Sequence, residues 1–566
     1  MTRLKSPIRG EVIDRSTLSS RNRFFHNRHT ARREQVKSKS IVLVLSAVLL
    51  LAVSGLAASD TLTYLFYGEP GEADPATAYD ARSSVVIENA YDRLLTYEGA
   101  DATKFAPQLA KEWMVSDDAM VLTFKLREDA VFHDKTPVTA DAVRYSFNRV
   151  LTMNQPPAWM LSQMMDLDST QVIDDHTVEI HLTQPYAAAL GVLTHTVASI
   201  VNPAVVEANG GIVAGEENLW MNQNEGGAGS GPYVLKEWIP AERLVFERFD
   251  NYWGEKGKIK TIECPIVLEM ATRIMLLRAG DADIHPYFPQ VNVPEVEGAE
   301  NLIIAPYASF DVDFIALGCR GPLEEKDVRQ AISYAYPYQQ SLDLIYQGYG
   351  SRLTGAIPDG MYGYYAIPAN QRYRLDLEKA NQILDGAGWV WPGEHGEGVR
   401  HKDYELLDME VLLPIGDELR MQQALLWQSE LKKIGFDLII REIVWAIAYK
   451  VVRAHESDGM CTGWLPDYPD PDNYADAILG ADNSDAIYGS SYDNPVMDAL
   501  IAAAKVEVDP VKRAALYKEI QELTHEDAPY IWVAQNINVT VLNERVKGYF
   551  YNPALQIKFE TLHFES

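Results

Sequence analysis

The chain has 566 residues, more than one hydrophobic core usually supports, so we expect two or three domains. Hydrophobic residues make up 47% of it and no repeat or low-complexity tract stands out, which is typical of a soluble globular protein. The formal net charge of -30 argues against nucleic acid or an anionic membrane as partner. It is consistent with cationic ligands, although solubility explains it equally well.

Residues 1–40 differ in composition from the rest, with 11 Lys+Arg against 3 Asp+Glu. An apolar run, residues 41–58, follows and ends in small residues. This is the plan of a secretory signal, so we expect cleavage near Gly55-Leu56-Ala57 and an extracytoplasmic, periplasmic protein. The alternative is that residues 1–58 stay as an N-terminal anchor, because about 18 apolar residues just suffice to span a membrane.

The first half of the mature chain alternates strand and helix patterns. Residues 121–127 alternate with period two, as in a half-buried strand. Residues 139–151 predict a helix that opens at a capping Thr139. Its apolar face carries Val143, Phe147, Val150 and Leu151.

The middle of the chain predicts a hairpin from residues 233–238 and 243–249, then a strand at 262–268. The strand leads into a helix that ends at Gly280, where a left-handed cap fits. Just before the hairpin, Gly226–Gly231 is the most flexible-looking link and a candidate domain boundary.

The later half repeats a strand–helix–strand order. Strands are predicted at residues 409–413 and 436–443, with a helix between them that Gly435 ends. Its apolar stripe carries Ala424, Trp427, Leu431 and Ile434. Asp509-Pro510 then begins a helix toward Leu523, and residues 530–534 return as a strand. The alternation predicts an α/β protein with mixed sheets.

The stretch Gly459–Asp476 combines three prolines, four carboxylates (Asp467, Asp470, Asp472 and Asp476) and three aromatic rings (Trp464, Tyr468 and Tyr474). The prolines predict rigid turn structure rather than the interior of a helix. A stiff loop of acids and aromatics suits an organic cation or a polar ligand with stackable faces, while an ordinary acidic surface turn is the alternative.

No catalytic motif is present. The chain lacks G-x-S-x-G, a phosphate-binding G-x-x-x-x-G-K-[ST] and H-E-x-x-H, and its glycine run precedes a strand rather than a helix. His133-Asp134 is interpreted as a structural pair rather than as metal ligands. Cys264, Cys319 and Cys461 are odd in number and widely spaced, so a disulfide framework is not expected. We expect no enzyme activity, no cofactor and no metal.

Several blocks, in order along residues 60–555, resemble one known family. They include Phe105-Ala-Pro-Gln-Leu-Ala-Lys-Glu-Trp, Thr139-Ala-Asp-Ala-Val-Arg-Tyr-Ser-Phe, Gly229-Ser-Gly-Pro-Tyr-Val-Leu-Lys-Glu-Trp and Leu377-Glu-Lys-Ala-Asn-Gln-Ile-Leu-Asp-Gly-Ala-Gly-Trp. The chain is identified by them as similar to the extracytoplasmic solute-binding proteins of ABC transporters, family 5, the dipeptide/oligopeptide class.

The resemblance implies a periplasmic-binding-protein-like α/β fold, with two lobes joined by a two-crossing hinge and an extra domain on lobe I. Lobe I would comprise residues 59–97, 228–305 and 531–566, the extra domain residues 98–227, and lobe II residues 306–530. The chain would cross between the lobes near Ala305 and Tyr530, and two crossings make a hinge that closes.

The resemblance also implies a ligand site. In peptide-binding relatives an Asp three residues after a Trp meets the ligand's α-ammonium, which corresponds to Asp467 after Trp464, with Leu465 and Tyr468 beside it. Beyond Asp74-Pro75, the segment Tyr79, Asp80 and Ala81 would pair with the ligand main chain as an added strand. Asp467 is alternatively a structural loop acid, and Trp464 alternatively fills core.

These implications describe a monomeric receptor that captures a peptide between two lobes and delivers it to a membrane ABC permease. An oligosaccharide receptor of the same fold is the first alternative, and a secreted hydrolase is the next. The chain departs from the family pattern at Lys135, at Tyr336-Pro337-Tyr338 and at Cys461. Lys135 stands where relatives usually carry glycine, and Cys461 stands where some tripeptide binders place a basic residue for the ligand carboxylate.

Overall fold

The computed structural model describes residues 60–222, 227–393, 397–554 and 557–565. Within it, Leu62–Ser566 form one compact unit. The predicted signal or anchor, residues 1–58, lies outside the described residues. Within the part of the chain that is described, no helix has the length and apolar character needed to cross a membrane.

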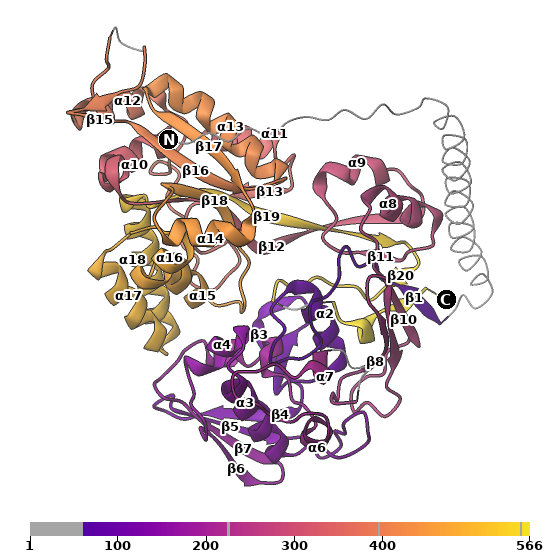
Figure 1. The fold of residues 1–566 in the computed structure, drawn as a ribbon. Coiled ribbons are helices and arrows are strands. Elements are labelled where there is room, and N and C mark those ends of the chain that lie inside the picture. The colour runs from indigo at the N-terminus through magenta and orange to yellow at the C-terminus, as the bar shows by residue number, and fades with distance from the viewer. Residues whose placement is uncertain (1–59, 223–226, 394–396, 555–556, 566) are drawn as a thin grey trace, which may run out of the picture. The chain divides into compact units, whose positions relative to one another are not determined.

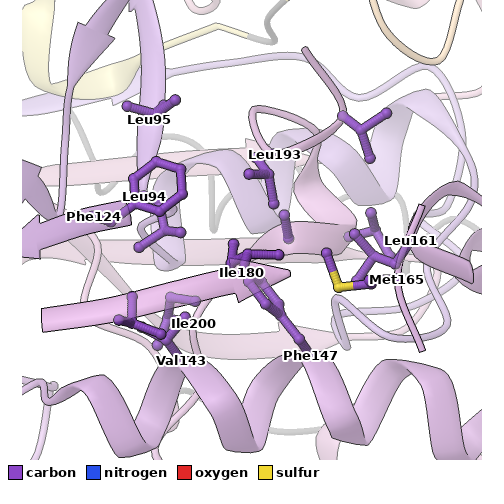
Figure 2. Close-up of a cluster of buried hydrophobic side chains, with 14 of the residues drawn as sticks. Leu94, Leu95, Phe124, Val143, Phe147, Leu161, Met165, Ile180, Leu193 and Ile200 are labelled. Atoms are coloured by element: carbon purple, nitrogen blue, oxygen red, sulfur yellow. The ribbon is translucent and has the colours of Figure 1, made fainter. Parts of the chain in front are cut away.

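A four-stranded antiparallel sheet and one helix enclose the first large core. The strand order is β4 (Ala110–Val115), β5 (Val121–Leu126), β7 (Thr177–His181) and β6 (Thr170–Asp174). Helix α3 (Ala140–Met153) turns Val143 and Phe147 toward Ile180 of this sheet, as Figure 2 shows. The predicted strand and helix are confirmed. Thr139 does occupy the N-cap position, but its side chain makes no capping hydrogen bond.

A second four-stranded sheet has the order β1 (Thr61–Thr63), β10 (Thr261–Pro265), β9 (Arg243–Arg248) and β8 (Tyr233–Ile239). Strands β8 and β9 form the predicted hairpin. The prediction of a flexible link just before β8 is wrong for its second half. A Cβ at Gly229 would lie 2.0 Å from the Ala90 carbonyl oxygen, and Gly231 donates a backbone hydrogen bond to the same oxygen at 3.0 Å. These glycines are needed for close packing.

The largest sheet has seven strands. Their order is β11 (Ile284–His285), β19 (Tyr530–Asn543), β12 (Leu302–Leu317), β18 (Gly459–Trp464), β16 (Asp408–Pro414) and β17 (Asp437–Ile443), with β13 (Gly350–Arg352) also paired to β19. Strands β16 and β17 are parallel and joined by α13 (Glu418–Leu431), as predicted. The helical segment ends at Gly435, whose φ is 75°.

Helices cover this sheet on both faces. Ile315 and Ile531 pack with Trp427 of α13 on one face, while Phe314 and Trp532, their neighbours in the chain, pack on the other. Adjacent strand residues point to opposite faces, so both must be apolar where both faces are covered. The helices are α10 (Lys326–Tyr334), α11 (Tyr338–Leu344), α12 (Leu377–Gly386), α14 (Trp445–Arg453), α16 (Ala481–Tyr488), α17 (Pro495–Val506) and α18 (Pro510–Asp527).

Two predicted helix ends are confirmed by their hydrogen bonds. Asp509 caps α18 by accepting from the backbone N–H groups of Val511 and Lys512. Helix α8 (Met270–Ala279) ends at Gly280 with φ 78°, the left-handed cap expected there.

The two longest strands, β12 and β19, run side by side through the sheet (Figure 1). Residues 302–308 of β12 pair with 537–543 of β19, and residues 312–316 pair with 530–535. A register shift separates these two paired segments, between Ala308 and Val312. Such irregularities interrupt the ladder and let strands bend locally. This interruption lies a few residues beyond Ala305, where a crossing between lobes is predicted.

Candidate ligand-binding site

The stretch Gly459–Asp476 contains three kinds of structure. Gly459–Trp464 form strand β18, between β12 and β16. A loop then runs to Pro471, and Asp472–Tyr474 (α15) and Ala475–Leu479 are helical. The prediction of turn structure is therefore right for residues 465–471 and wrong at both ends, because β18 gains its ladder bonds from strands far away in the chain.

Hydrogen bonds from side chains elsewhere in the protein hold three carboxylates of this stretch, Asp470, Asp472 and Asp476. Asp470 accepts two hydrogen bonds from the Arg513 guanidinium, at 2.6 and 2.8 Å. Lys505 donates to Asp476 at 3.3 Å. Asp472 is buried and accepts from the hydroxyl of Tyr186 at 2.6 Å. These acids hold the loop in place.

Asp467 is the partly buried carboxylate at the tip of the loop. Its Oδ2 accepts from the side-chain amide of Asn473 at 3.2 Å, and Asn473 Oδ1 accepts from the Asp467 backbone N–H at 3.1 Å. The same Oδ1 accepts from Trp464 Nε1 at 2.9 Å. Desolvation raises the pKa of Asp467 to about 6, against hydrogen bonds from Asn473 and Tyr79 that act to lower it. The carboxylate is thus fixed in position and short of counter-charge.

Asp467 lines a cavity of about 240 Å³. We call it the main cavity because most of the predicted contact residues line it, not because of its size. Its walls come from distant parts of the chain. The lining residues are Tyr79, Asp80, Ala81, Ser84, Glu88, Thr194, His195, Thr196, Tyr287, Leu465, Pro466, Asp467, Tyr551, Asn552, Pro553 and Ala554. No Lys or Arg occurs among these described residues. Burial lowers the pKa of His195 to about 3, so its imidazole is neutral at physiological pH. The wall charges are carboxylates.

The segment Tyr79, Asp80 and Ala81 lines the same cavity at the start of α2 (Ala81–Ala90). Asp80 caps this helix by accepting from the N–H groups of Arg82 and Ser83 at 3.0 and 3.2 Å. The prediction of an extended segment therefore holds for Asp80, with φ -143° and ψ 156°, and is wrong for Ala81, which is the first helical residue. Helix capping limits how far an added strand could extend.

A buried ion pair supports the segment before this wall. Asp74 and Arg149 of α3 make a two-pronged contact at 2.7 and 2.5 Å, and both side chains are almost fully buried. Asp74 also accepts from the Ala76 backbone N–H at 3.0 Å. Because Arg149 neutralises the Asp74 carboxylate, the Asp74-Pro75 turn can be buried just before the wall segment at residues 79–81.

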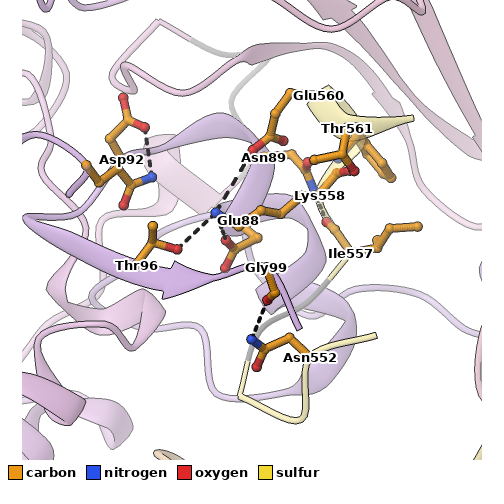
Figure 3. Close-up of polar contacts among 12 residues, drawn as sticks. Glu88, Asn89, Asp92, Thr96, Gly99, Asn552, Ile557, Lys558, Glu560 and Thr561 are labelled. Carbon is orange, nitrogen blue, oxygen red and sulfur yellow. Dashed lines mark hydrogen bonds and ion pairs between the residues drawn. The ribbon is translucent and has the colours of Figure 1, made fainter. Parts of the chain in front are cut away.

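Glu88 connects the main cavity to a buried polar network that joins α2 to the C-terminal segment (Figure 3). Its carboxylate lies 2.7 Å from the Arg93 guanidinium and 3.7 Å from Lys558 Nζ. Lys558 also donates to the Thr96 hydroxyl at 2.9 Å, and Asn552 donates to the Gly99 carbonyl at 2.7 Å. The Asn552 contact holds the 551–554 wall against Gly99, and the Lys558 contacts hold the C-terminal segment against α2 and Thr96.

Trp464 and Tyr468, both predicted at the site, do not line the main cavity. They line a second cavity of about 420 Å³, which we call the side chamber, and Tyr79 lines both. The wall residues at 194–196, Tyr287 and 551–554 were not predicted, and no local pattern marks them. Cys461 is buried in the core on β18 and lines neither cavity.

In the described ranges, no group of three or more His, Cys, Asp or Glu residues is placed to hold a metal ion. His133 is structural, because its Nε2–H donates to the Gly231 carbonyl at 3.0 Å and its ring packs on Phe249. The three cysteines are free thiols.

Comparison with known proteins gives one consistent family. Residues 104–486 match the model of the bacterial extracellular solute-binding proteins, family 5. A probable D,D-dipeptide-binding periplasmic protein of Escherichia coli K12 is 32% identical over 498 residues, covering 87% of this chain and 91% of that protein. The dipeptide-binding protein of the same strain is 29% identical over 556 residues, covering 94% and 99%.

Solved structures show the same fold. The periplasmic binding protein DppA of Helicobacter pylori, solved with the peptide STSA, superposes with a TM-score of 0.72 at 25% identity. The match covers 90% of this chain and 98% of that one. The α/β architecture is that of the two-lobed periplasmic binding proteins, as predicted from the sequence blocks.

Proposed function

Because this chain belongs to family 5 of the bacterial extracellular solute-binding proteins, we propose that it captures a short peptide between two lobes and delivers it to a membrane ABC permease. The family consists of binding proteins that act outside the cytoplasm. We propose that this one is exported by the signal at residues 1–58, acts as a monomer and catalyses no reaction.

The main observation behind the proposal is the environment of Asp467. Asn473 donates to its carboxylate and accepts from its backbone N–H, and Asp467 lines a cavity whose described walls contain no Lys or Arg. A peptide's α-ammonium would supply the missing counter-charge, in a charge-assisted contact worth roughly 1.5–3 kcal/mol net. Leu465 and the backbone of Tyr79 and Asp80 would contact the first residues of the peptide.

The proposed lobe division follows the sequence blocks. Lobe I comprises residues 59–97, 228–305 and 531–566, the extra domain 98–227 and lobe II 306–530. The register shift between Ala308 and Val312 supports a bending point in β12 close to the first crossing. Contacts to ligand from both lobes exist only in the closed form, so binding shifts the population toward closure, which the permease can then recognise.

An oligosaccharide receptor of the same fold is the less favoured alternative, because the two Escherichia coli relatives are named for dipeptides. A hydrolase is disfavoured by the absence of any catalytic motif in the sequence. Mass spectrometry of ligand released from the purified protein identifies what it carries. A thermal-shift screen of di- to pentapeptides against cello- and xylo-oligosaccharides then tests the class, because a specific ligand raises the melting temperature.

The expected result is a rise with peptides alone and titration calorimetry that shows binding of an intact peptide. The proposal fails if sugars alone raise the melting temperature, or if the peptide is consumed during the titration.

A further inference from the structure

The side chamber shares Tyr79 with the main cavity, and its lining combines aromatic and polar side chains. It is lined by Tyr79, Trp159, Ser162, Gln163, Trp464, Tyr468, Asp472, Asn473, Asp476, Ala477, Asn483, Ile487 and Lys505. Tyr79 belongs to both cavities, and its hydroxyl accepts a hydrogen bond from Trp159 Nε1 at 3.2 Å. Asn473, which holds Asp467, also lines the chamber. A group anchored at Asp467 is therefore beside the chamber.

The aromatic side chains of the lining suit a long apolar stem. Trp464 is fixed through its indole N–H to Asn473, and Trp159 is 37% exposed. The rings of Trp159 and Tyr468 lie 6.4 Å apart, and Ile487 adds an aliphatic surface. Aromatic faces attract cations, and apolar walls cover the methylene stem of a lysine or arginine.

The lining also contains a buried hydrogen-bond acceptor that lacks a donor. Asp472 is 1% exposed, and its Oδ2 accepts from Tyr186 and Tyr468 at 2.6 and 3.1 Å. Its Oδ1 is buried and has no hydrogen-bond partner among the described residues. An unpaired buried carboxylate oxygen is costly, so a donor from the chamber that reached Oδ1 would gain the full value of that bond.

The charges lining the chamber do not cancel. Among the lining residues Lys505 is the one cation beside Asp472 and Asp476, and its Nζ lies 3.3 Å from Asp476 and 5.6 Å from the centre of the Tyr186 ring. With all three groups ionised, the lining carries one net negative charge. Lys505 is thus engaged by Asp476, and a second cation would be needed to neutralise Asp472.

We propose that the side chamber receives the side chain of the ligand's first residue, and that Asp472 makes it selective for a basic side chain. This rests on the proposed function, since it takes the α-ammonium of a peptide to be held by Asp467. The apolar stem would lie along Trp159 and Trp464, and the ammonium or guanidinium head would donate to Asp472 Oδ1. The ligand class is then a short peptide with lysine or arginine at its N-terminus.

Titration calorimetry on the full-length, ligand-stripped protein with Lys-Ala and norleucine-Ala tests this, because norleucine keeps the stem and lacks the ammonium. The wild type is expected to bind Lys-Ala at least tenfold more tightly, as a hydrogen bond to a charged group implies. Asp472→Asn is expected to reduce that ratio to threefold or less and to leave norleucine-Ala affinity within threefold. A wild-type ratio near one, or an unchanged ratio in Asp472→Asn, overturns the proposal.

Lys505→Met gives a second measurement should Asp472→Asn fail to fold, as judged by circular dichroism. Removing the resident cation is expected to raise the Lys-Ala to norleucine-Ala ratio at least threefold, and an unchanged or lowered ratio counts against the proposal. Ala-Ala separates this inference from the function itself. If Ala-Ala binds in an Asp467-dependent way but Lys-Ala is not preferred, only the proposal for the side chamber is refuted. If no peptide binds at all, the proposed function is refuted.

Discussion

Replacing Asp467 by Asn should weaken peptide binding and, at the same time, stabilise the unliganded protein. The variant keeps an oxygen that can accept from Asn473 but loses the charge that would bind an ammonium. Peptide affinity should fall by a factor of ten or more, from a net bond of roughly 1.5–3 kcal/mol. The unliganded protein should become more stable, because the wild type keeps a desolvated carboxylate without full counter-charge.

The size of the stability change follows from the pKa. Asp467 has a pKa raised from 3.8 to about 6 by desolvation, so the folded state binds this proton more tightly than the unfolded chain does. Ionisation therefore destabilises the fold, fully above pH 6 and not at all below pH 3.8. The penalty at pH 7.5 is about 3 kcal/mol at most, at 1.36 kcal/mol per unit. Asp467→Asn removes it, and its melting temperature should exceed that of the wild type.

The same pKa predicts how affinity depends on pH. An ammonium ligand binds the ionised carboxylate, so the wild-type Kd should rise about tenfold from pH 7.5 to pH 5. His195 stays neutral across this range because its pKa is lowered to about 3. Asp472 also has a pKa of about 6, and Asp467→Asn leaves it intact as a control.

Calorimetry at both pH values, with thermal melts of ligand-free protein at pH 7.5, measures all three effects. A wild-type Kd that does not change, or an Asp467→Asn variant that melts lower than the wild type, would refute the reasoning. If Asp467→Asn keeps the tenfold pH dependence, another group is responsible for it.

Three further substitutions test the fold by urea denaturation. Lys135→Gly should stabilise by about 1 kcal/mol, because Lys135 is exposed with φ 72°, a conformation that glycine adopts freely; a loss of stability would contradict this. Arg149→Met should cost about 3–5 kcal/mol by leaving Asp74 buried and unpaired, and a cost under about 1 would show that the pair is dispensable. Gly229→Ala should cost at least about 3 kcal/mol, whereas Gly386→Ala, with open space around its Cβ, should not destabilise; equal effects would refute the packing argument.

Local patterns predicted the elements that local forces determine. The α18 cap at Asp509 depends on hydrogen bonds from two residues within three positions, Val511 and Lys512, and the β8–β9 hairpin depends on alternation and a short turn. That residues 459–464 form strand β18, and that Gly229 is closely packed, could not be predicted. Each depends on partners that lie far away in the chain. A glycine that fits against a distant carbonyl looks, in sequence, the same as a flexible one.

The site divides in the same way. Asp467 and Tyr79 could be proposed from matched blocks, but nothing local separates Asp467 from Asp470, which Arg513 neutralises from 43 positions away. Nor does any pattern place residues 551–554 on the cavity wall, since Asn552 is held there by the hydrogen bond that it donates to the distant Gly99 carbonyl.

By itself, the amino-acid sequence determined the family, the α/β class and the positions of most helices and strands, because periodicity, caps and motif order are written in neighbouring residues. Only the tertiary structure decided which acids are already paired, which walls enclose the main cavity and that a side chamber adjoins it. Charge and burial at a site are sums over everything nearby in space, and the chain order does not contain those distances.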